Sequence, residues 1–466
     1  MGETIRIFTG GKVVLPDRVT ECDIVTRGGK IIALGPYGET GGPVERVDLK
    51  GLVVLPGGVD PHLHLGHDKD ISRPRVPGDA ARETAAAAVG GITTFIPYLM
   101  ATDPFETLFD EVRSVTEAGS RIDFGYHFII STEAQLAGVP EYVRRYGVQS
   151  FKIFMNNRGG EGARLGLPDI DDGFLFRLCE AAAASGGVVC PHPETIEIAW
   201  VLRSRAKEND PDGTGGLATW NASRPDFVEA DAVQRSAYLA RMTGAHIYIV
   251  HTSSAEALEA ALMQRRAGAA ISIETCPHYL THDETYARGT VGKINPPLRS
   301  RANCDALWQA IKDGHVDTIG TDHVHRDITS KLPSVWDASP GCPGLETMLP
   351  VLLSEGHVKR GIPLPRIAAL TATNAANAFG IGASKGSIAV GKDADFAIVD
   401  PGAEWVLDTS HLKSSAGYSI YEGTRFTGKV LHTILRGAFI QRDGALIDSA
   451  IGQGRYLYRD PVSNGG

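Results

Sequence analysis

Two histidines separated by a single residue are the first sign of chemistry in this sequence. His62 and His64 end the segment "GLVVLPGGVDPHLH", which begins as an apolar run typical of a buried strand. Side chains at positions i and i+2 of a strand point to the same face, so both imidazoles can bind one metal ion. Taken alone, such a pair is more often a partly exposed pair of histidines than a metal site.

Four more residues of ligand type lie at the ends of strand-like segments further along the chain. Lys152 lies in "QSFKIFM", and His192, His251 and Asp322 close other apolar runs. Each has an ordinary explanation: a buried histidine bonds a backbone carbonyl, an aspartate caps a helix, and a lysine extends its amine to solvent. Their gathering at the same end of different strands indicates a metal centre instead.

Lys152 has unusually apolar neighbours for a lysine, because the segment around it reads Phe-Lys-Ile-Phe-Met. Burial lowers the pKa of a lysine, which leaves a neutral amine that can add carbon dioxide. The resulting carbamate is a bidentate anion able to bridge two divalent cations. We therefore predict that Lys152 is an N6-carboxylysine and a metal ligand.

The elements that position these residues alternate along the middle of the chain. Helical segments such as "GDAARETAAAAVGG" separate eight strand-like runs, and strands joined in this way pair in parallel. Eight of them predict an α/β fold with a closed (β/α)8 barrel, whose active site lies at the C-terminal strand ends. The predicted strands are 53–64, 91–98, 122–130, 149–155, 187–192, 246–251, 271–279 and 317–322.

The two ends of the chain contain short β-type runs broken by glycine. We expect them to build one small β-sandwich together, so that residues 1–55 and 386–466 flank a barrel of residues 56–385. The predicted strands of this unit are 5–8, 12–14, 23–25, 31–34, 395–399, 405–407, 430–435 and 438–441.

Composition narrows the functional class. The chain has 466 residues, is 42% hydrophobic and carries a net charge of −9 with no long basic run, which argues against nucleic acid or an anionic membrane as partner. It contains no uninterrupted apolar run of about 18 residues. Neither a signal-peptide core nor a C-x-x-C pair among the six cysteines is present, so we expect a cytoplasmic protein.

Several segments together resemble one family over nearly the whole chain. "GGVDPHLHL", "SFKIFM", "HTSSAEAL", "GTDH" and "KGSIAVGKDADFAIVD" resemble the cyclic-amide hydrolases of the amidohydrolase superfamily, a group with hydantoinase, dihydropyrimidinase, allantoinase and dihydroorotase. The resemblance implies a barrel with two divalent metal ions, usually Zn²⁺, and a homotetramer. It also implies the roles of the six residues: His62, His64 and Asp322 hold the more buried ion, His192 and His251 hold the other, and carboxylated Lys152 bridges them.

The resemblance is less specific about the substrate. Dihydroorotases carry an arginine where this chain has Gly66, which counts against that activity, although "ETCPHYL" and "KINPPLRS" resemble dihydroorotase or allantoinase segments. Hydantoinases place a tyrosine after the bridging lysine, where this chain has Asn156 and Asn157. An amide can also donate a hydrogen bond to a carbonyl, so we expect Asn157 to bind the substrate. We expect the same of Asn295, in the segment that binds the imide edge in the family.

Further polar residues surround these motifs. "HPET" replaces the usual "HAEN" of the family but keeps an acid, Glu194. We expect His323 to lie behind the metal ligands and leave His325 unassigned. Arg73 and Arg75 belong to a loop after the first barrel strand, and we interpret them as solvated charges.

The reaction that the resemblance implies is hydrolysis of a C–N bond in a ring. A water held between two metal ions loses a proton near neutral pH, and the resulting hydroxide attacks the ring carbonyl. Asp322 accepts the proton and passes it to the leaving nitrogen, as a general base and then a general acid. A hydantoin or dihydropyrimidine is the first expectation for the substrate. The alternatives are allantoin or another cyclic imide or lactam, and dihydroorotate is the least expected of these substrates.

Three other classes of protein fit parts of the pattern. A mononuclear deaminase of the same superfamily usually lacks the bridging lysine, so Lys152 counts against it. A non-catalytic scaffold, like the neuronal proteins that share this fold, would have lost metal ligands, and here all six positions are filled. A purely structural barrel with incidental histidines would be favoured if the protein bound no metal.

Overall fold

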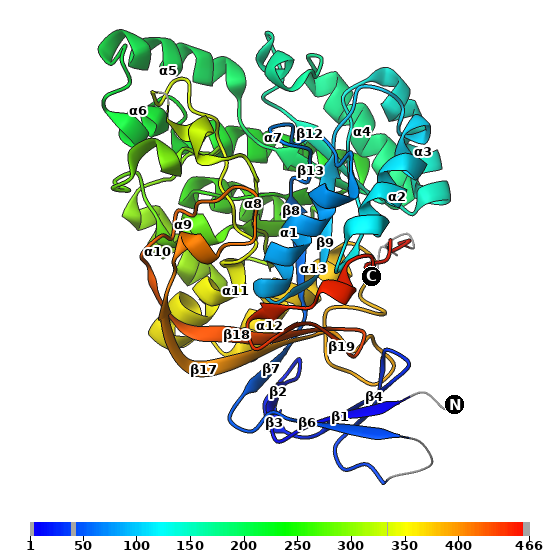
Figure 1. The fold of residues 1–466 in the computed structure, drawn as a ribbon. Helices are drawn as coiled ribbons and strands as arrows, with labels where there is room; N and C mark the ends of the chain where they lie inside the picture. The colour runs from blue at the N-terminus through cyan, green and yellow to red at the C-terminus, as the bar shows by residue number, and fades with distance from the viewer. Residues whose placement is uncertain (1–3, 39–42, 333, 460–466) are drawn as a thin grey trace.

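A ring of parallel strands forms the centre of the protein. The computed structural model describes residues 4–38, 43–332 and 334–459, and Figure 1 shows the ring surrounded by helices. The barrel strands are β8 (Gly58–Leu63), β9 (Ile92–Leu99), β10 (Asp123–Phe124), β11 (His127–Ile129), β12 (Ser150–Phe154), β13 (Val188–His192), β14 (His246–Ile249), β15 (Ile271–Thr275) and β16 (Thr318–Ile319).

The order of these strands confirms the predicted (β/α)8 barrel. β8 pairs with β9, and both β10 and β11 pair with β9 as two pieces of one barrel strand. The order then follows the chain from β11 to β16, always in parallel. A parallel bridge between Leu63 and His323 brings the segment after β16 back to β8 and nearly closes the ring.

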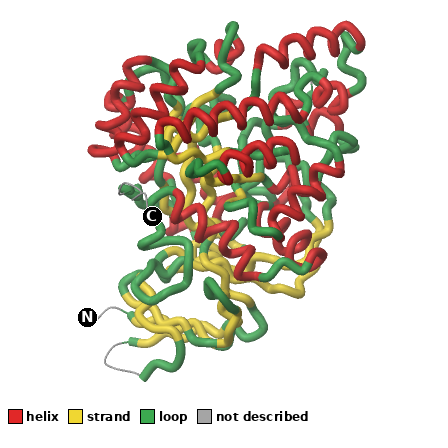
Figure 2. The backbone as a smooth tube through the Cα atoms, turned by 180° about the vertical axis from the view of Figure 1, so that it is seen from behind, coloured by secondary structure: helices red, strands yellow, loops and turns green. Residues whose placement is uncertain are grey.

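Helices follow most barrel strands and cover the outside of the ring, as Figure 2 shows in red. Among the described residues, no helix combines the length and the apolar character needed to cross a bilayer. The α-helices are α1 (Pro77–Val89), α2 (Phe109–Gly119), α3 (Glu133–Tyr146), α4 (Asp172–Ser185), α5 (Ile196–Asn209), α6 (Gly216–Ala222), α7 (Asp226–Thr243), α8 (Ala255–Arg266), α9 (Pro277–Thr281), α10 (Arg301–Lys312), α11 (Met348–Val351), α12 (Leu364–Ala368) and α13 (Asn374–Ala378).

Local sequence explains where these helices begin and end. At the start of α3, Thr132 Oγ1 accepts a hydrogen bond from the backbone N–H of Gln135, and the Gln135 amide oxygen accepts one in return from Thr132. This reciprocal cap satisfies amides that lack a partner within the helix. The same helix ends at Gly147, which has a φ of 63° that glycine adopts at little cost.

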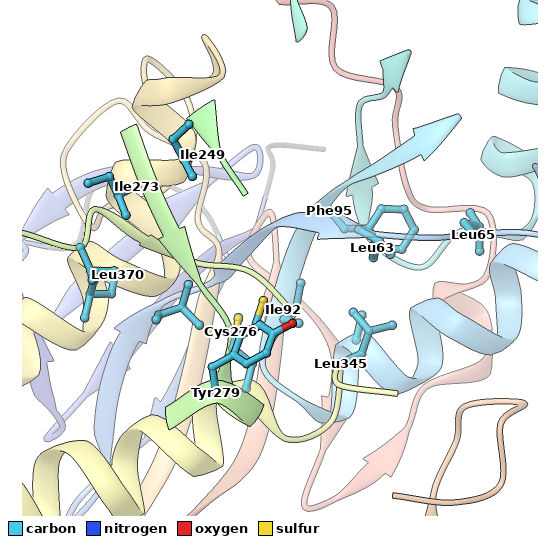
Figure 3. Packing of buried hydrophobic residues seen from close by; sticks show 14 of the residues in the cluster. Leu63, Leu65, Ile92, Phe95, Ile249, Ile273, Cys276, Tyr279, Leu345 and Leu370 are labelled. Atoms are coloured by element: carbon cyan, nitrogen blue, oxygen red, sulfur yellow. The ribbon is translucent and has the colours of Figure 1, made fainter. Parts of the chain in front are cut away.

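The main core lies between the barrel and its helices. Figure 3 shows Ile249 and Ile273 from the paired strands β14 and β15, with Leu63 and Phe95 from β8 and β9. All four are fully buried. Complete burial of one such side chain stabilises the fold by about 1.5–3 kcal/mol, so this layer holds the strand ends in a fixed arrangement.

Both chain ends build the β-sandwich below the barrel, as predicted. One sheet has the order β5 (Lys30–Leu34), β4 (Ile24–Arg27), β1 (Ile5–Thr9) and β6 (Val44–Asp48). The other sheet joins C-terminal to N-terminal strands in the order β20 (Ala445–Leu446), β19 (Ala438–Arg442), β18 (Arg425–Leu435), β17 (Phe396–Val406), β7 (Val53–Pro56), β2 (Lys12–Val14) and β3 (Val19–Glu21).

The prediction of a single strand over residues 53–64 is wrong. The chain leaves the sandwich after β7, which pairs with β17 and β2, and enters the barrel at β8. Gly57 lies at this crossing, where an added Cβ would come within 2.2 Å of the Thr93 hydroxyl. The apolar run continues through both strands, so hydrophobicity alone does not reveal the break. The domain limits at 55 and 385 stay a prediction.

Other strand limits also differ from expectation. The run 271–279 ends as a strand at Thr275, because Pro277 starts α9 and has no N–H to continue a ladder. The run 317–322 is a strand only over Thr318–Ile319. Residues 405 and 406 are the end of β17 rather than a separate strand, residue 407 follows that strand, and β3, β6 and β20 were not predicted.

Candidate metal centre

The six predicted ligands meet at the C-terminal end of the barrel. They come from β8, β12 and β13 and from the segments after β8, β14 and β16. All six line one cavity of about 110 Å³, and none is more than 7% exposed. The six are His62, His64, Lys152, His192, His251 and Asp322.

His62, His64 and Asp322 form the tighter group within this cavity. The Oδ1 atom of Asp322 lies 3.2 Å from Nε2 of His62 and 3.7 Å from Nε2 of His64. One ligand atom from each of the three residues lies within 4.8 Å of the other two. These are the residues that the resemblance assigns to the more buried ion.

Three of the predicted ligands lie beyond their strands, and two of these, His251 and Asp322, also have an unusual backbone conformation. His251 is two residues past the end of β14, and Asp322 is three residues past the end of β16. Their φ angles are 39° and 46°, in the left-handed region that residues other than glycine rarely adopt. Such a conformation costs about 1–3 kcal/mol and is characteristic of functional sites.

His192 and His251 face each other across the second half of the cavity. Nδ1 of His192 lies 2.9 Å from Nε2 of His251. The other nitrogen of His192 donates to the Glu194 carboxylate at 2.7 Å, which leaves the Nδ1 lone pair of a neutral ring directed at His251. Two imidazole nitrogens that converge in this way are suited to a shared cation.

Lys152 lies in the interior between these groups. Its side chain is 1% exposed, and its Nζ atom is 3.5 Å from Nε2 of His62 and 4.5 Å from the centre of the Tyr98 ring. Within the described ranges, no carboxylate lies within 4.0 Å of this amine. Burial lowers the pKa of Lys152, although Asp322 acts in the opposite direction. This is the environment in which a neutral amine can add carbon dioxide.

The protonation states of three of the other histidines favour metal binding, whereas His62 has a raised pKa in the absence of a metal. Burial lowers the pKa of His64 to about 3 and also lowers the pKa values of His192 and His251, so these imidazoles keep free lone pairs. Burial opposes the charged form of His62, but Glu274 and Asp322 outweigh it and raise the pKa.

The donor set fits a pair of divalent ions. Burial raises the pKa of Asp322, but His62 and His64 together bring it below the ordinary value, which leaves a carboxylate. Nδ1 of His64 and Nδ1 of His251 are buried without a hydrogen-bond partner in the described structure. Imidazole nitrogens with a carboxylate suit zinc and similar metals, and a carbamate on Lys152 would remove the one amine from the set.

Glu274 supports the ligands from behind, a role that was not predicted. One of its carboxylate oxygens accepts from Nδ1 of His62 at 2.6 Å and from the backbone N–H of His251 at 2.8 Å. The other accepts from the Tyr248 hydroxyl at 2.9 Å. A carboxylate in this position orients a metal-binding imidazole and makes it a better ligand. The only signal for this role in the sequence is the position of Glu274, an acid near the end of the strand segment "ISIET".

Glu194 and His323 hold other parts of the ligand set. Glu194 accepts from His192 and, at 2.8 Å, from the Arg224 guanidinium. Burial raises its pKa, but Arg224 and His192 together outweigh this and the pKa falls to about 2. His323 lies behind the ligands, 3.0 Å from the Glu83 carboxylate, and its carbonyl accepts from the backbone N–H of His64.

The remaining histidine and the loop arginines lie outside this network. Both ring nitrogens of His325 are buried without a partner in the described structure. Arg75 pairs with Asp70 at 3.1 Å and is half exposed. Arg73 and Arg75 do not line the cavity of the metal centre.

The predicted substrate-binding amides line the same cavity. Asn157 is almost fully buried there, and its neighbour Asn156 has a buried side-chain oxygen without a partner among the described residues. Asn295 lines the cavity from the connection after β15, and its side-chain oxygen accepts a hydrogen bond from Nε1 of Trp220 at 3.2 Å.

Three arginines also line this cavity, and sequence reasoning missed them. Arg164, Arg224 and Arg326 come from the connections after β12, β13 and β16. None of the three belongs to a motif, and only the fold brings them together.

Comparisons with known proteins agree with this arrangement. The model of the amidohydrolase family matches residues 226–440. The chain is 31% identical to a D-hydantoinase from Geobacillus stearothermophilus, over 97% of this chain and 96% of the relative. It is 32% identical to an allantoinase from Escherichia coli O139:H28, over 93% of this chain and 94% of the relative. The crystal structure of a dihydropyrimidinase from Brevibacillus agri superposes on this structure with a TM-score of 0.90 at 28% identity. The superposition covers 99% of this chain and 100% of the dihydropyrimidinase chain.

Proposed function

The chain belongs to the amidohydrolase family, and from this premise we propose that it hydrolyses the ring C–N bond of a cyclic amide at a centre of two divalent metal ions. The observation that carries the proposal is the gathering of six buried ligand side chains around one cavity. Lys152 is the decisive member, since it is buried there without a carboxylate partner in the described structure.

We assign the ligands in two groups joined by the lysine. One ion would be held by His62, His64 and Asp322. The other ion would be held by His192 and His251, and carboxylated Lys152 would bind both ions. Zinc is the metal we propose, since nitrogen and carboxylate donors suit it. Two such ions supply a water that is acidic near neutral pH and a Lewis acid for the ring carbonyl.

Asp322 is the residue that we propose to move the proton. Its pKa lies below the ordinary value, so its carboxylate is ionised at neutral pH and can accept a proton. Asp322 can then return this proton to the ring nitrogen as the C–N bond breaks, which releases a neutral amine or amide nitrogen. Asp322 lines the cavity of the metal centre, with Oδ1 3.2 Å from Nε2 of His62, and this supports the proposed role.

Asn157 and Asn295 are the residues that we propose to bind the ring. They line the cavity from two different connections, those after β12 and β15, so we assign one to the carbonyl and the other to the imide edge. Asn156 is an alternative to Asn157, because its buried oxygen lacks a partner in the described structure.

Hydantoins and dihydropyrimidines are the first substrates that we propose, and allantoin or another cyclic imide or lactam is the alternative. The similar identities to a D-hydantoinase and an allantoinase, 31% and 32%, support both. The test is a panel of hydantoin, dihydrouracil, allantoin, dihydroorotate, succinimide and a lactam, with ring opening followed by chromatography. Zinc-loaded enzyme should open at least one ring, and metal-free enzyme none. Failure with every ring at full metal content would contradict the proposal.

We also propose a cytoplasmic location and a homotetramer. All six cysteines are free, which is usual for a reducing compartment. The tetramer rests on the family resemblance, and light scattering of the purified protein tests it.

A further inference from the structure

A second cavity adjoins that of the metal centre, and we call it the vestibule. It has a volume of about 290 Å³ and lies between the connection after β12, helices α5 and α6, and the segments around 293 and 336. The two cavities share lining residues, among them Arg164, Arg224 and Asn295. A substituent on a ring bound at the metal centre can therefore extend into the vestibule.

The vestibule is rich in positive charge. Its lining includes the acid Glu161 and five cations, Arg164, Arg203, Lys207, Arg224 and Lys293. Glu161 pairs with Arg203, and Arg224 is paired with Glu194 beneath the cavity. Over the described ranges, the other three cations have no carboxylate within 4.0 Å. This surplus contrasts with the negative charge of the whole chain, −9.

Lys293 is the most confined of the unpaired cations. Its side chain is almost fully buried, with Nζ 3.3 Å from the carbonyl oxygen of Trp336 and 4.1 Å from the centre of the Trp220 ring. Burial and the nearby cations Arg164, Lys331 and Arg224 lower its pKa to about 7, while Asp337 acts weakly in the opposite direction. An anion in the vestibule would relieve this repulsion.

The walls of the vestibule suit an apolar arm with a charged end. Trp220 and Trp336 line it with their ring centres 6.3 Å apart, and Lys207 lies over the Trp336 ring at 5.3 Å. Aromatic faces pack against carbon atoms, whereas guanidinium and ammonium groups bind a carboxylate through charged hydrogen bonds.

We propose that the vestibule binds a carboxylate carried on an exocyclic arm of the substrate, so that the preferred substrates are cyclic amides with an acidic side chain. This inference rests on the proposed function. Arg164 is the central residue, because it lines both cavities and has no carboxylate partner in the described structure. Lys293, whose amine packs against the Trp220 ring, contributes the second positive charge.

The test compares two hydantoins that differ only at the end of the arm. The zinc-loaded enzyme is assayed with hydantoin-5-propionic acid, with its neutral amide and with unsubstituted hydantoin. We expect kcat/KM to be about tenfold higher for the acid than for the amide, as one charged hydrogen bond provides. The preference should fall at high salt, which screens a partly exposed site.

Substitutions of vestibule residues test whether the preference for the acid over the amide arises in the vestibule. Arg164→Gln and Lys293→Met should each bring the ratio of acid to amide toward one. Arg27→Gln, at the exposed end of β4 in the sandwich, should keep the wild-type ratio. Melting temperature and metal content identify any variant that is misfolded.

A binding measurement keeps the inference separate from the proposed function. Glutarate, which has no ring, is titrated into zinc-loaded enzyme while tryptophan fluorescence is followed, with glutaramide as the neutral control. Quenching by glutarate that Arg164→Gln weakens about tenfold supports the vestibule site even if no ring is hydrolysed. Equal effects of glutarate and glutaramide, or turnover of the amide as fast as the acid, would overturn the inference while hydrolysis of hydantoin stands.

Discussion

The amine of Lys152 lies 3.5 Å from Nε2 of His62, and both side chains are shielded from solvent. An ammonium and an imidazolium at this separation repel each other strongly where the dielectric constant is low. The pair is therefore compatible with a neutral or carboxylated lysine and incompatible with two positive charges. A carbamate would turn this amine into an anion and would suit the surrounding histidines to binding cations.

Replacing Lys152 with alanine should remove most of the activity and reduce the bound metal below two ions per chain, because the bridging anion is lost. Acetate or propionate at high concentration should restore part of the activity by occupying the vacated space. Ring hydrolysis and metal analysis measure both effects. Lys429→Ala, on an exposed part of β18, is the matched control. Full activity of Lys152→Ala without added acid would exclude the bridge.

Replacing Glu274 with glutamine should weaken metal binding about 10- to 100-fold, since the substitution keeps the shape but removes the charge behind His62. Competition with a chelator measures the affinity, and the remaining activity should return at high zinc concentration. Glu256→Gln on the exposed side of α8 serves as control. An unchanged zinc affinity would mean that Glu274 only holds the barrel together.

Replacing Asp322 with asparagine should lower kcat about 10²- to 10⁴-fold, the usual contribution of a general base. Metal analysis of the same preparation separates loss of the proton acceptor from loss of a ligand. The acid limb of the pH–rate profile should also change, which a purely structural role would not produce. Asp305→Asn on the surface of α10 is the control. A variant with wild-type kcat and two ions would assign the proton transfer to another group.

The buried pair of Glu83 and His323 should make stability depend on pH. Burial raises the pKa of Glu83, but the hydrogen bond and charge of His323, together with the hydrogen bond from Ser415 and the charge of His325, lower it from 4.5 to about 2. A carboxyl group with a depressed pKa stabilises the fold above its ordinary pKa, and the contribution, of about 3 kcal/mol, disappears as pH falls toward 2.

Thermal unfolding of Glu83→Gln tests this dependence. The variant should melt below wild type at pH 6, and the difference should shrink as the pH falls from about 5 to about 3. Glu111→Gln on the exposed face of α2 should show no such trend. A difference that stays constant with pH would show that the charge of Glu83 contributes nothing.

The cluster of six candidate ligands was predictable because each member lies in, or within three residues after, a strand whose segment is evidently apolar. The spacing of His62 and His64 and the apolar surroundings of Lys152 carry information within a few residues. The barrel was predictable for the same reason, since strands and helices alternate with clear periodicity.

The rest depends on contacts between distant parts of the chain. Glu274 is 212 residues from His62, and nothing in its own segment indicates that the two meet. At the break between β7 and β8, the side chain of Thr93 from the next strand leaves no room for a side chain at position 57. The vestibule cations Arg164 and Lys293 lie in separate connections, so only the closed barrel brings their charges to one cavity.

The most direct test of the two-metal centre is a high-resolution crystal structure of the protein purified with zinc, with anomalous diffraction measured on both sides of the zinc absorption edge. We predict two anomalous peaks among His62, His64, His192, His251 and Asp322, and continuous density for a carboxylate beyond Nζ of Lys152. A single peak or none, or an unmodified amine on Lys152 in fully loaded crystals, would contradict this prediction.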